Sequence, residues 1–157
     1  MEKLPIQSKK KIAAVIAMAA TTILGFEGYK SVPYLDSVNK PTVCIGHTGG
    51  VDMGRIYSKA ECDELMRGDL GKAFQAVDRC IHVPLSDQTK AALASFTFNV
   101  GGTALCSSTL AVRLNRGEGA PACDELLKWV YAGGRKVAGL LKRRQFEREL
   151  CIEGFQT

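Results

Sequence analysis

The stretch GFEGYKSVPYLDSVNKPTVCIGHT, residues 25–48, joins a helix end to the only good strand signal in the chain. Gly28 can adopt the left-handed conformation that ends many helices, so we expect the preceding helix to stop there. From Tyr29 to Ile45 the sequence alternates and is rich in Val, Tyr and Thr, which predicts a small hairpin or meander. A helix is therefore expected to lead directly into a small antiparallel sheet.

Two acidic residues in this stretch have contrasting surroundings. Glu27 falls on the last turn of the expected helix, where the negative end of the helix dipole and the apolar Phe26 disfavour the ionised carboxylate. Asp36 falls in a turn-rich stretch, where solvent and local amides favour the ionised form. Glycoside hydrolysis needs such a pair, one carboxyl as the acid for the leaving oxygen and one as base or nucleophile.

Thr42 is a third candidate. It begins the expected strand 42–45, so the return of the hairpin could bring its hydroxyl beside Asp36 to hold a water molecule. On spacing alone, three polar residues on a solvated hairpin are the more common explanation of this pattern.

The rest of the chain predicts helices. Ser58 and Glu61 form a capping box that begins a long helix reaching about Arg79. Four more helices are expected: from Ser86 to near Gly101, from Ser107 to Arg116, from Pro121 to before Gly133, and from Lys136 to Ile152. The fold class is therefore α+β, mostly helical with a small antiparallel β-sheet near the N-terminus.

The N-terminal region has the layout of an export signal. Lys9–Lys11 precede IAAVIAMAATTILGF, residues 12–26, which has no charge. As a helix this run spans roughly 22 Å, less than the roughly 30 Å of a bilayer core. Three interpretations fit: a signal cleaved at Ala17–Ala19, an uncleaved anchor that later leaves the bilayer, and an ordinary buried helix. The uncleaved segment is favoured, because cleavage would remove the helix that holds Glu27.

Composition limits the function further. The chain has 157 residues, enough for one domain, and a net charge of +5 from 21 Lys and Arg against 16 Asp and Glu. These values exclude a disordered tail and a multi-span membrane protein. The basic excess suits an anionic polymer, but no nucleic-acid-binding motif accompanies it, so nucleic acid is not an expected partner.

The six cysteines indicate disulfides. They lie at wide intervals without a CxxC pair, and the only histidines, His47 and His82, do not complete a zinc site, so no metal is expected. Three disulfides in an oxidising compartment are the natural interpretation, and six buried thiols are the alternative. Six cysteines allow 15 pairings. Pairing cysteines that follow one another along the chain suggests the disulfides Cys44–Cys62 and Cys123–Cys151.

The residues quoted above resemble the phage-type lysozymes, glycoside hydrolase family 24. The motif of that family is a Glu, eight residues, an Asp, five residues and a Thr, followed by a Gly-His pair, here Gly46-His47. FTFNVGG (96–102) with SSTL (107–110) looks like the groove-lining segment of the family, and KWVYAGGRKVAGLLKRRQFEREL (128–150) looks like its C-terminal helices. The resemblance covers nearly the whole chain from Phe26.

The resemblance implies an enzyme that hydrolyses the β-1,4 bond between N-acetylmuramic acid and N-acetylglucosamine in bacterial peptidoglycan, with no cofactor or metal. Glu27 would be the general acid, Asp36 would activate or stabilise the attacking water, and Thr42 would position it. Phe98 and Thr109 match positions that line the sugar groove in the family. Inversion at the anomeric carbon is usual in the family, and we expect a monomer.

The N-terminal run and the cysteines look like those of the signal-anchor-release endolysins. Such enzymes are exported, held inactive at the periplasmic face of the inner membrane, and activated when the anchor leaves the bilayer. Residues 1–26 would then become the first helix, with membrane contact through 12–26, and residues 27–157 would form the lysozyme-like domain. A lytic transglycosylase and a catalytically silent wall-binding protein are the alternatives.

Other residues receive structural interpretations. His47 is expected to be a hydrogen-bonding residue behind the sheet rather than a base. Trp129 and Tyr131 are expected in the core or the cleft wall. Arg143 and Arg144 could include a partner for Glu27, but a solvated basic helix face is at least as plausible.

Overall fold

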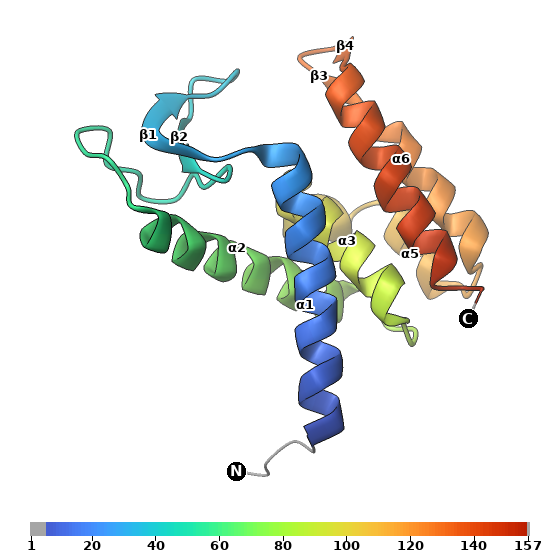
Figure 1. Ribbon diagram of the computed structural model, residues 1–157. Helices are drawn as coiled ribbons and strands as arrows, with labels where there is room; N and C mark the ends of the chain where they lie inside the picture. The colour runs from blue at the N-terminus through green and yellow to red at the C-terminus, as the bar shows by residue number, and fades with distance from the viewer. Residues whose placement is uncertain (1–5, 157) are drawn as a thin grey trace.

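The computed structural model describes the backbone of residues 6–156 and the side chains of residues 14–156 except that of Glu27. The elements follow in the order α1 (Ile6–Glu27), β1 (Lys30–Leu35), β2 (Pro41–Cys44), α2 (Lys59–Cys80), α3 (Asp87–Val100), α4 (Gly102–Cys106), α5 (Thr109–Asn115), the 3-10 helix η1 (Ala120–Lys128), β3 (Tyr131–Ala132), β4 (Arg135–Lys136) and α6 (Ala138–Glu153) (Figure 1). The fold is α+β and mostly helical with a small antiparallel sheet near the N-terminus, as predicted.

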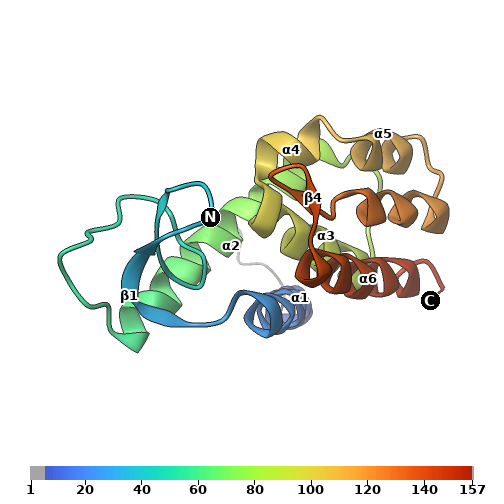
Figure 2. The same cartoon turned by 90° about the horizontal axis from the view of Figure 1, so that it is seen from above.

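The elements form two lobes. β1, β2 and the start of α2 make the smaller lobe, and α2 runs from it into the larger helical lobe (Figure 2). In the smaller lobe Tyr34 pairs with Thr42 across the hairpin. Its core contains Val43, Tyr57 and the Cys44–Cys62 disulfide, and none of the described side chains of α1 belongs to it. This lobe therefore has a packed centre of its own.

Helix α1 packs on α3 through a narrow apolar stripe. Val15, Ala19 and Ile23 recur every fourth residue, which places them on one helix face, and all three are buried. They share a core cluster with Ala91 and Ala94 of α3, whose small side chains allow the helices to approach closely. Hydropathy identifies no membrane-spanning helix within the described part of the chain.

Helix α3 lies at the centre of the larger lobe. Residues 91–97 are buried in an unbroken run, so the helix is covered on all sides, by α1, α2 and α6. A second core cluster joins α3 to the later helices through Leu93, Phe96, Leu110 and Leu126. Trp129 packs edge-on against Phe96 with ring centroids 5.3 Å apart, which confirms its expected place in the core.

Local capping signals located the helix starts well. Ser58 and Glu61 form both bonds of the predicted capping box, and Ser86 caps α3. The cap of α5 is Ser108, one residue later than expected. The short helix α4 was not predicted.

The predicted helix from Pro121 to Gly133 is wrong in its second half. The 3-10 helix ends at Lys128, and β3 then pairs with β4 in a second hairpin. Gly133 and Gly134 have φ values of 56° and 75°, as the two central residues of a type I′ turn require. Tyr131 lies on this hairpin and is 63% exposed, so it is not in the core, and its other expected place, the cleft wall, stays a prediction.

The cysteines form three disulfides. Cys44–Cys62 and Cys123–Cys151 are the pairs suggested by the sequence, and Cys80–Cys106 is the third. All six cysteines are thereby bonded, so the alternative of six reduced thiols does not hold.

Candidate active site

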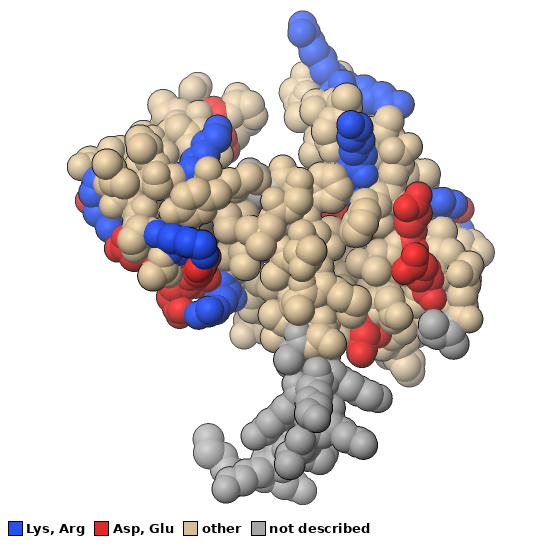
Figure 3. All heavy atoms as spheres, viewed as in Figure 1, with Lys and Arg blue, Asp and Glu red and all other residues tan. Residues whose placement is uncertain are grey.

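The candidate residues Glu27 and Asp36 lie at the end of α1 and directly after β1, the strand that follows α1 in the chain. α1 ends at Glu27, and Gly28 has the predicted left-handed conformation with φ +67°. The side chain of Glu27 lies outside the described residues, so its orientation is not stated. The surface is hollowed between the β1–β2 lobe and the lobe that bears α6 (Figure 3).

Asp36 occupies the turn of the first hairpin. Its Oδ1 accepts hydrogen bonds from the backbone N–H groups of Val38 and Lys40, both at 2.9 Å. These are the local amides that the sequence predicted, and they fix the carboxylate in a half-buried position. Among the described residues, Oδ2 has no hydrogen-bond partner.

Thr42 lies across the same turn and is buried. Its hydroxyl donates to the backbone oxygen of Lys40 at 3.0 Å, and the backbone N–H of Asp36 donates to that same oxygen, also at 3.0 Å. The shared acceptor ties the start of β2 to the residue that follows β1. The oxygen of the Thr42 hydroxyl keeps its lone pairs to accept a further hydrogen bond.

A cavity of about 250 Å³ lies between the lobes. Phe98, at the end of α3, is one of its walls, and Gly46, Thr48, Asp69 and Lys72 line it from the smaller lobe and α2. Thr109 is exposed at the start of α5 and is not among the residues that line this cavity. Phe98 thus lines the cavity, and a contact of Thr109 with the sugar stays a prediction.

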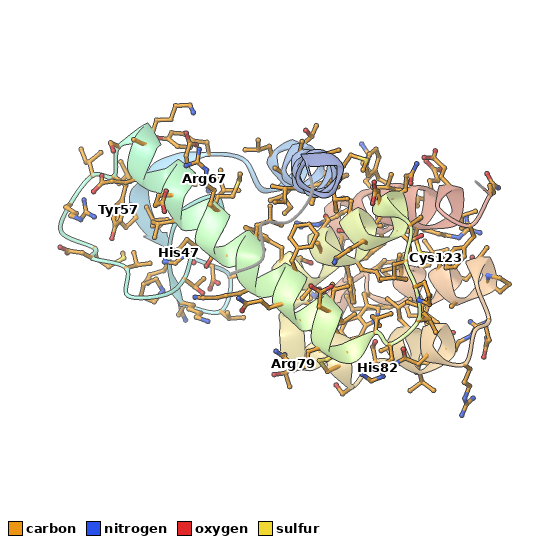
Figure 4. The ribbon with its side chains drawn as sticks, turned by 90° about the horizontal axis from the view of Figure 1, so that it is seen from below. His47, Tyr57, Arg67, Arg79, His82 and Cys123 are labelled. Atoms are coloured by element: carbon orange, nitrogen blue, oxygen red, sulfur yellow. A yellow bond between two sulfur atoms is a disulfide. The ribbon has the colours of Figure 1, made fainter. Side chains whose placement is uncertain are left out.

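His47 is held between the smaller lobe and α2 (Figure 4). Its Nε2 donates to the backbone oxygen of Gly49 at 2.6 Å, and its Nδ1 lies 2.6 Å from Oδ2 of Asp69. Both ring nitrogens are engaged and the residue is buried. This geometry agrees with a structural hydrogen-bonding residue rather than a base.

Arg143 and Arg144 are not on a solvated helix face, so that alternative is wrong. They are 3% and 0% exposed, and Glu147, one turn later on α6, is 0% exposed and pairs with both. Whether either contacts Glu27 falls outside the described residues. Both oxygens of the buried Glu147 carboxylate therefore have a guanidinium partner, as a buried charge requires.

Three features of the site were missed from the sequence. Asp69 both lines the cavity and pairs with His47, 22 residues earlier. Lys72 follows one helical turn later, with its Nζ 4.0 Å from Oδ1 of Asp69. Glu147 had only its spacing to Arg143 as a signal, and that spacing is equally common on solvated helices.

The described residues contain no cluster of three His, Cys, Asp or Glu side chains placed to hold a metal ion. Several charges in the larger lobe are paired with one another, as Glu125 is with Arg113 and Lys128. Lys128, and then Arg113, hold the pKa of the Glu125 carboxyl below its usual value.

Comparisons with known proteins cover nearly the whole chain. The profile of the family described as Phage lysozyme matches residues 24–147. A SAR-endolysin of Enterobacteria phage PA-2 is 39% identical over 98% of this chain and 100% of its own length. A mutant of phage P22 lysozyme is 33% identical over 88% of this chain and 95% of its own, with a TM-score of 0.72.

The endolysin Lyz of phage P1 is similar in fold and has been solved in two forms. Its active form covers 93% of each chain at 23% identity with a TM-score of 0.78. Its secreted inactive form covers 85% of this chain and 94% of its own at 20% identity, with a TM-score of 0.58. The arrangement of elements described above is thus more similar to that of the active form.

Proposed function

This chain belongs to the phage lysozyme family and is a glycoside hydrolase, and from that premise we propose that it is a muramidase endolysin that hydrolyses the β-1,4 bond between N-acetylmuramic acid and N-acetylglucosamine in bacterial peptidoglycan. Hydrolysis of the wall in this way leads to lysis of the host cell. The observation that carries the proposal is the first hairpin, which joins Asp36 and Thr42 through one carbonyl oxygen directly after the helix that ends at Glu27.

Glu27 is the proposed general acid. Its place at the carboxyl end of α1 exposes it to the negative end of the helix dipole, which favours the protonated carboxyl. A protonated carboxyl can donate its proton to the glycosidic oxygen as the bond breaks.

Asp36 and Thr42 are the proposed partners of the attacking water. The two amide donors hold Oδ1 of Asp36, which leaves Oδ2 to take a proton from the water. Because the hydroxyl hydrogen of Thr42 is already donated to Lys40, its oxygen would accept the second hydrogen of that water. Attack by a water held in this way gives inversion at the anomeric carbon.

Phe98 and Thr109 are proposed to contact the glycan. Phe98 presents an aromatic wall to the cavity between the lobes, suited to the apolar face of a sugar ring. Thr109 is exposed at the beginning of α5 and would offer a hydroxyl to a ring further along the chain. The net charge of +5 favours approach to the anionic wall.

We also propose that residues 1–26 work in two places. They first anchor the protein in the inner membrane through residues 12–26. After release they form α1 of a soluble periplasmic monomer, in which residues 27–157 are the lysozyme-like domain. Thr21 and Thr22, the only polar side chains in the run 12–26, donate to the backbone oxygens of Ala17 and Met18 at 2.9 Å. Their hydrogen bonds are satisfied within the helix and so would persist in lipid.

The test of the proposed chemistry is release of reducing sugar from purified peptidoglycan. Glu27→Gln keeps the shape of the side chain but removes the acid, and we expect a fall of about a hundredfold or more. Glu64→Gln on the exposed side of α2 is the matched control and should keep full activity. Equal activity of Glu27→Gln and the unaltered chain would overturn the assignment, and anhydro products would instead identify a lytic transglycosylase.

A further inference from the structure

Three charged residues of α6 are buried close to the carboxyl end of α1. Arg143, Arg144 and Glu147 have exposed fractions of 3%, 0% and 0%. Charged side chains are almost never buried to this degree unless they are paired, and the cost of burial is large when one partner is missing. Nothing in the hydrolysis of a glycosidic bond requires a buried carboxylate at this place, so Glu147 needs an explanation of its own.

Glu147 is the hub of the cluster. Its Oε1 accepts hydrogen bonds from the Ser95 hydroxyl at 2.7 Å and from Nε of Arg143 at 3.0 Å. Its Oε2 accepts from Nη1 of Arg144. One carboxylate thus orients two guanidinium groups and is itself oriented from α3.

The two guanidinium groups also contact other elements. Nη2 of Arg143 donates to the backbone oxygen of Ser95 at 3.0 Å, and the guanidinium carbon lies 5.8 Å from the centre of the Phe26 ring. The guanidinium of Arg144 donates to the backbone oxygen of Trp129 at 3.1 Å and to Oδ1 of Asn99. Arg143 therefore holds its positive charge beside the residue that precedes Glu27.

This placement has an electrostatic consequence. A helix carries partial negative charge at its carboxyl end, where the last backbone oxygens lack partners within the helix, and a cation there is stabilising. The hydrogen bonds just described come from α3, from α6 and from Trp129, the residue after η1, so these contacts do not require α1. Among the described side chains of α1, Phe26 lies over Arg143 and edge-on to Phe146 at 6.0 Å. The contacts from α3, α6 and Trp129 can therefore orient the arginines before α1 packs.

We propose that Glu147 is a positioning residue that holds Arg143 and Arg144 as a preformed receptor for the carboxyl end of α1, and in this way fixes the position of residue 27. The inference deepens the proposed function and rests on it for its catalytic consequence. Its structural part, the ordering of two arginines by one carboxylate, stands independently of the reaction.

The variant Glu147→Gln tests the proposal, because it keeps the shape of the side chain and removes the charge. We expect kcat to fall by about tenfold or more with KM within about twofold, as for a misplaced reacting group, at a temperature where circular dichroism shows the variant folded. Glu147→Asp restores the charge at a shorter reach and should recover part of kcat. Glu149→Gln, exposed on the same helix, is the control and should leave kcat unchanged.

A second measurement does not depend on activity. In ¹⁵N spectra of the full chain, the Nε–H signals of Arg143 and Arg144 should exchange slowly with solvent, and exchange should become faster in Glu147→Gln. If that variant does not fold, Ser95→Ala removes a single bond to Glu147 and should accelerate the same exchange.

The outcomes separate the two claims. Unchanged kcat in folded Glu147→Gln overturns the positioning role, while loss of activity in Glu27→Gln leaves the proposed function intact. If the unaltered chain lacks muramidase activity, the proposed function fails and arginine exchange alone decides the inference. Protection that is equal in Glu147→Gln and the unaltered chain overturns it.

Discussion

Helices α1 and α6 both pack on α3, but they do so with opposite chemistry. The buried stripe of α1 consists of small or aliphatic side chains, and residues 12–26 hold no charge. The buried face of α6 holds the charged cluster around Glu147, and Cys151 ties the helix to Cys123. Moving α6 away would expose a network whose charges depend on one another, whereas the buried stripe of Val15, Ala19 and Ile23 carries no charge. The contrast fits the proposed function, in which α6 belongs to a fixed frame and α1 is the helix that changes place.

The largest expected effect comes from placing a buried charge on α1, so that α1 no longer packs on α3 through uncharged side chains. Ala19 is fully buried against α3, so Ala19→Asp places a carboxylate there without a partner, and we expect a loss of about 3–5 kcal/mol in the free energy of unfolding. Urea unfolding followed by circular dichroism measures it. Ala17→Asp on the exposed side of the same helix should cost about 0.5 kcal/mol or less. Equal losses would show that α1 does not pack through this stripe.

The second prediction concerns the fixed frame. Replacing Cys123 and Cys151 together by Ser opens a loop with a sequence separation of 28, and we expect a loss of about 3–4 kcal/mol. Urea midpoints of the unaltered and double-variant proteins provide the comparison. Activity at a temperature where both proteins are folded should stay the same, because the disulfide joins α6 to η1 and not to α1 or the first hairpin. If the double variant is as stable as the unaltered chain, the disulfide does not stabilise the fold.

The smallest expected effect concerns an exposed charge in the first turn of α2, which serves as a comparison for the buried charges of α6. The backbone N–H of Ser58, and then the guanidinium of Arg55, hold the pKa of the Glu61 carboxyl below its usual value of 4.5. A lowered pKa in the folded state means that ionised Glu61 stabilises the protein above the pKa of the unfolded chain, and that this contribution is lost as pH falls through the folded pKa. Glu61→Gln should therefore melt at a slightly lower temperature near neutral pH and approach the unaltered chain in acid. A constant difference in Tm across pH would contradict this account.

Features controlled by neighbouring residues could be predicted from the sequence. Gly28 ends α1, and Ser58 and Ser86 begin α2 and α3, because caps and turns depend on a few adjacent residues. The hairpin turn that holds Asp36 follows from the same local chemistry.

Features that depend on distant residues could not be predicted. The burial of Arg143 follows from Ser95, 48 residues earlier, and the setting of His47 follows from Asp69, 22 residues later. The second hairpin was missed for another reason. A glycine pair ends a helix and also forms a type I′ turn, so Gly133 and Gly134 alone do not distinguish the two.

The order of the disulfides has a consequence for how the chain matures. The bonds Cys44–Cys62, Cys80–Cys106 and Cys123–Cys151 each join one cysteine to the next along the chain, so every covalent loop closes before the following one opens. A chain that emerges through a translocation channel from its N-terminus presents its cysteines in that order. An oxidant that joins each cysteine to the next one to emerge reaches this one of the 15 possible pairings directly, without thiol exchange to correct it.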